Sequence, residues 1–195
     1  VGLGGTGVSA FLSASDTGAS VIGVEAAAKV GGTSATVGGP MAINPEDSSV
    51  QPESGTEGYP IDTDAFEKQW IKDTNGKAKE ECIDIMMNDS GSTLDWLIED
   101  HGFSFTPLSN FMMYPYILYS EYNIQNTITQ QYINALDEAC KKNEKNQYLT
   151  EVKAEKILSE NGKITGIEAK GADGTIYKIH AKSVILATGG FGGNA

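Results

Sequence analysis

The chain opens with glycines at positions 2, 4 and 7, the spacing of a phosphate-binding turn between a strand and a helix. In such a turn Gly2 permits the tight bend, Gly4 lets the backbone approach a diphosphate, and Gly7 allows the helix to pack closely on the strand. Amides at the start of the helix, from Gly5 and Thr6 onward, carry the positive end of its dipole. This feature predicts that the chain binds a ligand through phosphate.

A strand that ends in an acid follows the helix at the spacing of a dinucleotide fold. Residues 21–24 form a short apolar run, which is typical of a buried strand in a parallel sheet, and Glu25 comes directly after it. A carboxylate about 20 residues beyond the glycines accepts hydrogen bonds from a ribose. The two features together predict an adenine dinucleotide as ligand. The alternative is a strand–helix–strand unit whose glycines only form turns.

Composition excludes several classes of function. The chain has 195 residues, of which 39% are hydrophobic, and a net charge of −12, which argues against nucleic acid or an anionic membrane as partner. No apolar run has the length of a membrane span. Cys82 and Cys140 are isolated, so we expect small buried hydrophobic residues and no metal site. A full strand before Gly2 is lacking, so we expect a missing N-terminal segment, and the compartment stays open.

The pattern of helix and strand signals divides the chain into three stretches. Residues 43–61 are expected to form an exposed loop, residues 62–142 to be mainly helical, and residues 147–189 to be mainly β. The expected helices begin at Asp62 or Asp64, run from 77 to 89 with Cys82, Ile85 and Met86 inward, restart at a capping box at Ser92, and span 127–142. Residues 103–126 are expected to be irregular.

Turn signals organise the C-terminal stretch. One or two strands are expected within residues 147–159, with tight turns at Asn161-Gly162 and Asp173-Gly174. Residues 183–188 read as a short buried strand that runs into Gly189.

Further glycine motifs carry a resemblance to a known family. Gly31-Gly32-Thr33-Ser34, Gly38-Gly39-Pro40-Met41 and the segment 187–194 occur in the order seen in FAD flavoproteins. The chain resembles the N-terminal part of the fumarate reductase/succinate dehydrogenase flavoprotein family, within it the soluble flavocytochrome c-type fumarate reductases. The resemblance implies an α/β fold: a Rossmann-like FAD-binding domain, with a parallel sheet, helices and a β-meander. A capping domain and a return segment would follow Ala195.

The resemblance also implies which residues contact the cofactor. The implied FAD-binding residues are Gly2, Gly4, Gly5, Thr6, Gly7, Glu25, Ala26, Gly32, Thr33, Ser34, Gly38, Gly39, Met41, Val152, Ala187, Thr188 and Gly189. Within this set, residues 33 and 34 would bond the diphosphate or the ribityl chain, and residues 38, 39 and 41 would lie along the flavin ring. Val152 would meet adenine through its backbone, and residues 187–189 would close over the dinucleotide.

Two departures from the family pattern refine this expectation. Ala26 stands where many members have a basic residue. No histidine occurs between Thr33 and Gly39, where members with covalent flavin have one, so the FAD is expected to be non-covalent.

The implied activity is transfer of a hydride between flavin N5 and a carbon–carbon double bond of a small organic substrate. The chain contains no arginine, although family fumarate reductases clamp a dicarboxylate with arginines. We therefore expect the catalytic residues beyond Ala195, or a substrate that is not a dicarboxylate, and no activity of this segment alone. A separate haem or flavin domain or protein would supply electrons. The alternatives are a non-catalytic nucleotide-binding module and an NAD-dependent dehydrogenase, against which the later glycine motifs argue.

Overall fold

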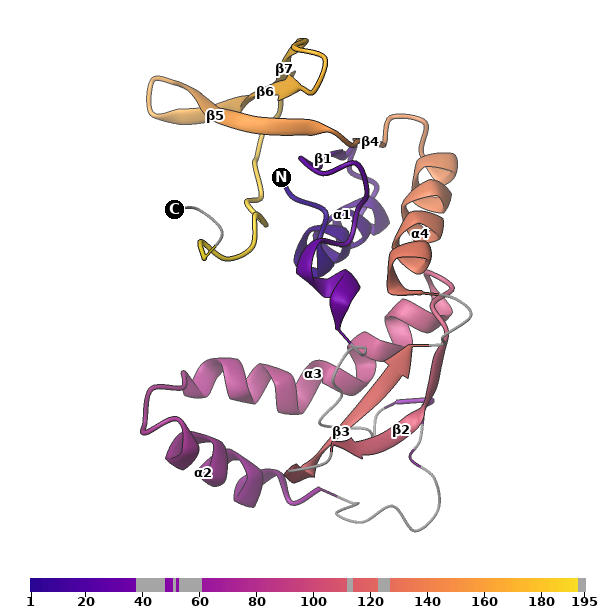
Figure 1. Ribbon diagram of the computed structural model, residues 1–195, viewed down its shortest axis with the longest axis vertical. Coiled ribbons are helices and arrows are strands. Elements are labelled where there is room, and N and C mark those ends of the chain that lie inside the picture. The colour runs from indigo at the N-terminus through magenta and orange to yellow at the C-terminus, as the bar shows by residue number, and fades with distance from the viewer. Residues whose placement is uncertain (38–47, 51, 53–60, 112–113, 123–126, 193–195) are drawn as a thin grey trace. The chain divides into compact units, whose positions relative to one another are not determined.

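The computed structural model describes residues 1–37, 48–50, 52, 61–111, 114–122 and 127–192 (Figure 1). The chain divides into two compact units. The first consists of Val1–Val37 with Ile128–Ala195, and the second of Gly38–Thr127. The second unit is therefore an insertion in the sequence of the first, and each is described by itself.

A parallel sheet forms the centre of the first unit. Strand β1 (Ile22–Val24) pairs with β4 (Gln147–Leu149) in parallel, with Ile22 opposite Gln147 and Val24 opposite Leu149. The start of the chain lies beside the end of β1, where the Gly2 amide donates to the Val24 carbonyl at 2.8 Å. Helices α1 (Gly5–Asp16) and α4 (Ile128–Lys142) belong to the same unit. The predicted order of glycine turn, helix and strand is confirmed.

An antiparallel meander follows β4 (Figure 1, orange to yellow). It consists of β5 (Val152–Glu160), β6 (Lys163–Gly171) and β7 (Ile176–His180), in that spatial order. Asn161 and Gly162 join the first two strands with φ of 49° and 76°, as a two-residue hairpin turn requires. The meander and its turns agree with the sequence prediction.

The expected buried strand at residues 183–188 is wrong. The segment is extended but unassigned to any sheet, and Ile185 and Leu186 are 54% and 58% exposed. The segment pairs in parallel with Val1. The Val1 amino group donates to the Ile185 carbonyl at 2.7 Å, and the Ala187 amide donates to the Val1 carbonyl at 2.8 Å.

A buried asparagine joins three elements of the first unit. Asn146 is 4% exposed and precedes β4. Its amide nitrogen donates to Ser15 Oγ at 2.8 Å and to the Ala139 carbonyl at 3.1 Å, and its side-chain oxygen accepts from the Val21 amide at 2.9 Å. Each polar atom of the side chain is therefore satisfied, and the bonds tie α1, α4 and the start of β1 together.

The second unit contains α2 (Thr63–Asp73), α3 (Glu80–Glu99) and a hairpin of β2 (Phe105–Phe111) and β3 (Tyr114–Tyr122). Asp62 caps α2 as predicted, since its carboxylate accepts from the Ala65 amide at 2.9 Å. Phe66 and Trp70 pack edge to face inside this unit, with ring centroids 5.3 Å apart.

Helix α3 is continuous, although an interruption at Ser90-Gly91 and a capping box at Ser92 were expected. Its buried stripe is Ile83, Met87, Gly91 and Leu94, so the i, i+4 pattern passes through the glycine and outweighs its weak helix propensity. Ser92 Oγ bonds back to the Asp89 carbonyl at 3.2 Å within the helix.

The inward face predicted for this helix is wrong at Cys82 and Ile85, whereas Met86 packs against the core of this unit. Ile85 and Cys82 are exposed and Met86 is half-buried, while the buried positions lie one residue further along. The expectation of a small buried cysteine therefore fails at Cys82, whereas Cys140 is half-buried.

The hairpin corrects the prediction that residues 103–126 are irregular. Each strand contains a proline, Pro107 in β2 and Pro115 in β3, and proline argues against a central strand. In a two-stranded sheet both strands are edges, so proline is tolerated. The ladder shifts register between Phe105 and Leu108, where Pro107 lies.

The expected exposed loop at residues 43–61 falls largely outside the described residues. The described part includes Ser48, which is buried, and Ser49. Ser48 Oγ donates to the Asp95 carboxylate at 3.0 Å and the Ser49 amide donates to it at 2.7 Å. This short stretch is therefore fastened to α3.

Candidate cofactor-binding site

The turn at Gly2 lies against the segment at Ala187. Gly2 has a φ of +84°, a region in which a side chain is strained. A Cβ at this position would collide with the Ala187 carbonyl oxygen and lie 2.9 Å from its carbonyl carbon. Glycine is therefore required here by the fold itself.

Gly7 and Gly4 differ in what surrounds them. A Cβ at Gly7 would collide with the Gly2 carbonyl oxygen, so this glycine allows α1 to pack on the turn. A Cβ at Gly4 would meet nothing closer than the Gly31 carbonyl oxygen, at 3.6 Å, which is an ordinary contact. The packing of the protein leaves room for a side chain at Gly4. An open glycine at this position of the motif fits a ligand whose phosphates approach the backbone.

A second glycine segment lies beside the first. Gly4 and Gly31 form a parallel bridge, and the Gly31 amide donates to the Leu3 carbonyl at 2.7 Å. Gly32 has a φ of +49° and begins the short 3-10 helix η1 (Gly32–Thr36). The Cβ of any residue at position 32 would lie 3.5 Å from the Gly4 Cα, so the two glycine motifs face each other closely.

Ser34 of η1 reaches the start of α1. Its Oγ accepts a hydrogen bond from the Gly5 amide at 3.1 Å. Thr33 and Thr6 are both exposed, and the Thr33 carbonyl accepts from Thr36 Oγ1 at 2.7 Å. The structure thus brings Gly4, Gly5 and Ser34 together.

The N-terminus of α1 is suited to an anion. The helix has 12 residues, Gly4 caps it without a side-chain bond, and its first turn contains no acidic residue. The first amides of an α-helix lack partners within the helix and carry the positive end of its dipole. Here the Gly5 amide bonds an uncharged hydroxyl, so the positive electrostatic potential that attracts a phosphate is not neutralised.

Glu25 is held by backbone amides next to this turn. One carboxylate oxygen accepts from the Leu3 amide and the other from the Ala27 amide, both at 2.8 Å. A carboxylate offers about four acceptor positions, so each oxygen retains capacity for a further donor. A diol such as ribose supplies two donors. The carboxylate is thus fixed in place beside the glycine turn with acceptor capacity to spare.

The remaining predicted residues fall into four groups. Ala187, Thr188 and Gly189 follow the extended segment: Ala187 covers Gly2, while Thr188 and Gly189 are exposed. Val152 is buried and its amide donates to the Glu25 carbonyl at 2.9 Å, which leaves this amide committed to the sheet. Ala26 is exposed next to Glu25. The predicted residues Gly38, Gly39 and Met41 lie outside the described residues.

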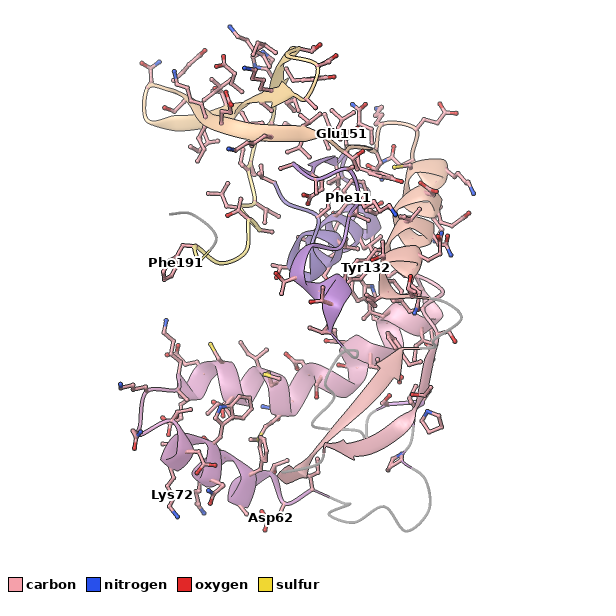
Figure 2. The ribbon with its side chains drawn as sticks, in the orientation of Figure 1. Phe11, Asp62, Lys72, Tyr132, Glu151 and Phe191 are labelled. Carbon is pink, nitrogen blue, oxygen red and sulfur yellow. The ribbon has the colours of Figure 1, made fainter. Side chains whose placement is uncertain are left out.

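Sequence reasoning missed Tyr132 of α4. The side chain, labelled in Figure 2, is half-buried. Its hydroxyl would lie 3.2 Å from a Cβ at Gly5 and is hydrogen-bonded to Ser34. Burial raises the pKa of this phenol, and the bond to Ser34 opposes the rise. Tyr132 lies within the helix predicted over residues 127–142, and no local pattern indicated which group its hydroxyl would meet.

The described part of the chain offers no other obvious chemistry. Within it, no group of three or more His, Cys, Asp or Glu side chains is placed to hold a metal ion. None of the helices described has the length and apolarity required to cross a bilayer.

Comparisons with known proteins agree with the geometry. The family model of the FAD binding domain matches residues 1–195. The urocanate reductase of Eggerthella lenta is 26% identical over the whole chain, which covers 31% of that protein. The open conformation of a flavocytochrome c3 fumarate reductase superposes with a TM-score of 0.75 at 25% identity, over 98% of this chain and 33% of that one.

A more distant structure shares the fold. A 3-ketosteroid-Δ4-(5α)-dehydrogenase from Rhodococcus jostii RHA1 gives a TM-score of 0.66 at 17% identity, over 93% of this chain and 43% of that one. The chain spans about a third of the length of the urocanate and fumarate reductases that it matches. The glycine turn, the open Gly4, the anchored Glu25 and the full-length family match lead to one conclusion: the chain belongs to the FAD-binding domain family, and its cofactor is FAD.

Proposed function

We propose that this chain supplies the FAD site of a reductase that acts on carbon–carbon double bonds of small organic acids. The observation that carries the proposal is the close approach of the two glycine motifs at Gly4 and Gly31, with Glu25 fixed beside them. The similar proteins are, by name, a urocanate reductase, a fumarate reductase and an NADH:acrylate oxidoreductase of Vibrio harveyi, the last 45% identical over 47 residues and 24% of this chain.

The residues of the chain have separate parts in holding the cofactor. The amides at the start of α1 and the Ser34 hydroxyl would bind the diphosphate, and the Glu25 carboxylate would accept from the adenosine ribose. Ala187 to Gly189 would cover the dinucleotide, and Gly38, Gly39 and Met41 would lie along the ring. When bound, FAD supplies the hydride chemistry, while the protein positions it. The FAD is expected to be non-covalent.

The test uses the full-length protein in its flavin-loaded form. The flavin is reduced without oxygen by a viologen dye, and fumarate, acrylate and urocanate are added in turn while flavin absorbance is recorded. Rapid return of the oxidised spectrum with at least one of them supports the proposal. Retained flavin that none of these acids reoxidises favours the non-catalytic module. A protein that binds NAD and retains no flavin refutes the FAD site altogether.

We also infer that the reducing electrons come from a separate haem or flavin domain or protein. The support is the name of the flavocytochrome c3 relative. On this inference, NADH mixed with the purified flavin-loaded FAD-binding segment leaves the flavin oxidised, while a reduced viologen reduces it. Fast flavin reduction by NADH alone contradicts the inference.

A further inference from the structure

Glu151, in the connection between β4 and β5, has a backbone conformation that is unusual for its residue type (Figure 2). Its φ is +57°, in the left-handed region. Among the described residues, the others with a positive φ that are not glycine are Asn75 and Asn161. Asparagine tolerates this region because its short polar side chain can hydrogen-bond locally, which a glutamate side chain does less readily. Strain of this kind is concentrated at ligand-binding sites.

The surrounding backbone fixes Glu151 beside the acid that is assigned to the ribose. The Glu151 amide donates to the Ala27 carbonyl, and the Glu151 carbonyl accepts from the Ala172 amide, both at 2.9 Å. The next amide, that of Val152, donates to the Glu25 carbonyl at 2.9 Å. Both backbone groups of Glu151 are therefore bonded within the protein, and its side chain is the group left to meet a ligand.

This connection lies at the edge of the parallel sheet where a dinucleotide binds. In open α/β sheets, ligands bind beyond the carboxyl ends of the strands. Glu25 directly follows the carboxyl end of β1, and Thr150 follows that of β4. The alanines at positions 26–28, next to Glu25, are all exposed and present only methyl groups. An adenine joined to a ribose at Glu25 would therefore meet no large side chain from residues 26–28 at this edge.

The Glu151 carboxylate has the chemistry to select an adenine. The residue is exposed, and within the part of the chain that the structure describes no hydrogen bond or ion pair involves its carboxylate. An ionised carboxylate only accepts hydrogen bonds, and the 6-amino group of adenine only donates them. A hydrogen bond to a charged acceptor is also stronger than one between neutral groups.

We propose that Glu151 is a specificity-determining residue for FAD, whose carboxylate accepts a hydrogen bond from the 6-amino group of the adenine. This inference rests on the FAD site proposed above. The sequence led us to expect the backbone of Val152 to meet the adenine, but the amide of that residue is bonded to Glu25. The neighbouring carboxylate supplies the polar contact in its place, and the left-handed backbone holds it at the sheet edge.

The test uses flavin-stripped full-length protein and two nucleotides. One is ADP, and the other is the 5′-diphosphate of purine riboside, which lacks the 6-amino group. Calorimetric titration compares the wild type, Glu151→Ala and Glu151→Gly. We expect the wild type to prefer ADP by roughly three- to tenfold, the range of one partly exposed hydrogen bond, and both variants to lose this preference. The ratio of the two affinities is the readout, because removing a charge affects both diphosphates alike.

Glu151→Gly also separates selectivity from folding. Glycine adopts a positive φ without a steric cost, so the apo variant should melt no lower than the wild type although its preference for ADP is lost. Glu160→Ala, at the opposite end of β5, is the matched control, because it removes the same charge from an exposed position. This control should keep the preference of the wild type.

Three outcomes overturn the proposal: a wild type that binds both nucleotides equally, an undiminished preference for ADP in Glu151→Ala, and an equal loss of preference in Glu160→Ala. A glycine variant that melts well below the wild type contradicts the strain assigned to position 151. Failure of the unmodified protein to bind FAD or either diphosphate would instead refute the FAD site.

Discussion

Replacing Gly4 and Gly7 with alanine, one at a time, separates the role of a glycine in binding from its role in folding. At Gly7 the new methyl group would collide with the Gly2 carbonyl oxygen and lie 2.8 Å from its carbon, and real Cβ atoms essentially never approach within 3.0 Å. The obstacle is backbone rather than a flexible side chain, so we take the upper end of overpacking costs, about 3 kcal/mol. Better helix propensity returns about 1 kcal/mol.

The net loss of about 2 kcal/mol at Gly7 corresponds to a fall in melting temperature of roughly 4–8 °C for a protein of this size. At Gly4 the φ is −78° and the nearest atom is 3.6 Å away, so alanine fits. Its poorer capping costs about 0.5–1 kcal/mol, and the stiffer unfolded chain returns a similar amount. The apo Gly4→Ala protein should therefore melt close to the wild type.

Gly4→Ala should have little effect on stability but a large effect on the affinity for FAD. The methyl group of Gly4→Ala would fill the space through which the backbone approaches the diphosphate, so we expect affinity to fall at least about tenfold, or 1.4 kcal/mol. Thermal melting of the apo proteins and fluorescence titration with FAD measure the two effects. Wild-type FAD affinity in Gly4→Ala would refute the assigned position of the diphosphate, and wild-type stability in Gly7→Ala would refute the packing argument.

Three further predictions concern side chains. Glu25→Gln should weaken FAD by about tenfold or more in the same titration, since the amide nitrogen cannot accept from a ribose hydroxyl, and unchanged affinity would contradict the ribose role. Asn146→Ala should lower the free energy of unfolding by about 2–4 kcal/mol in urea melts, because buried partners lose their bonds, whereas Asn134→Ala, at an exposed position of α4, should cost under about 0.5 kcal/mol; equal losses would refute the argument. Desolvation would raise the pKa of Asp95, but hydrogen bonds from Ser49 and Ser48 outweigh it, so the pKa is lowered from 3.8. The ionised carboxylate therefore stabilises the fold above pH 3.8, and this stabilisation is lost as the pH falls through the lower pKa of the folded state. Asp95→Asn should make unfolding less dependent on pH in the acid range below the ordinary carboxyl pKa, and an unchanged acid transition would contradict this.

Local signals predicted much of the fold. The glycine turn, the cap at Asp62, the helix that ends at Lys142 and the turn at Asn161-Gly162 each depend on a few adjacent residues, and the structure contains all of them. The continuous helix through Gly91 was missed because packing along a stripe overrode a local break signal.

Features that depend on distant partners could not be read from the sequence. Residues 183–188 look like a buried strand, but burial is set by neighbours, and the pairing is with Val1. The open space at Gly4, the two amides on Glu25 and the hydroxyl of Tyr132 beside Ser34 are all products of tertiary packing. Motif spacing indicated Gly4 and Glu25 but gave no sign of Tyr132.

Residues 38–127 interrupt the sequence of the first unit, and this affects how that unit folds during synthesis. The Val21 amide and the Asn146 side chain bond across 125 positions, so the opening segment leaves the ribosome long before its partners have been made. Loops that close over such distances form slowly, and domains complete only when their last contributing stretch emerges. A nascent chain arrested before α4 should therefore fail to capture the coenzyme, and so should one arrested at β4, because residues 187–189 that lie against Gly2 have not yet been made.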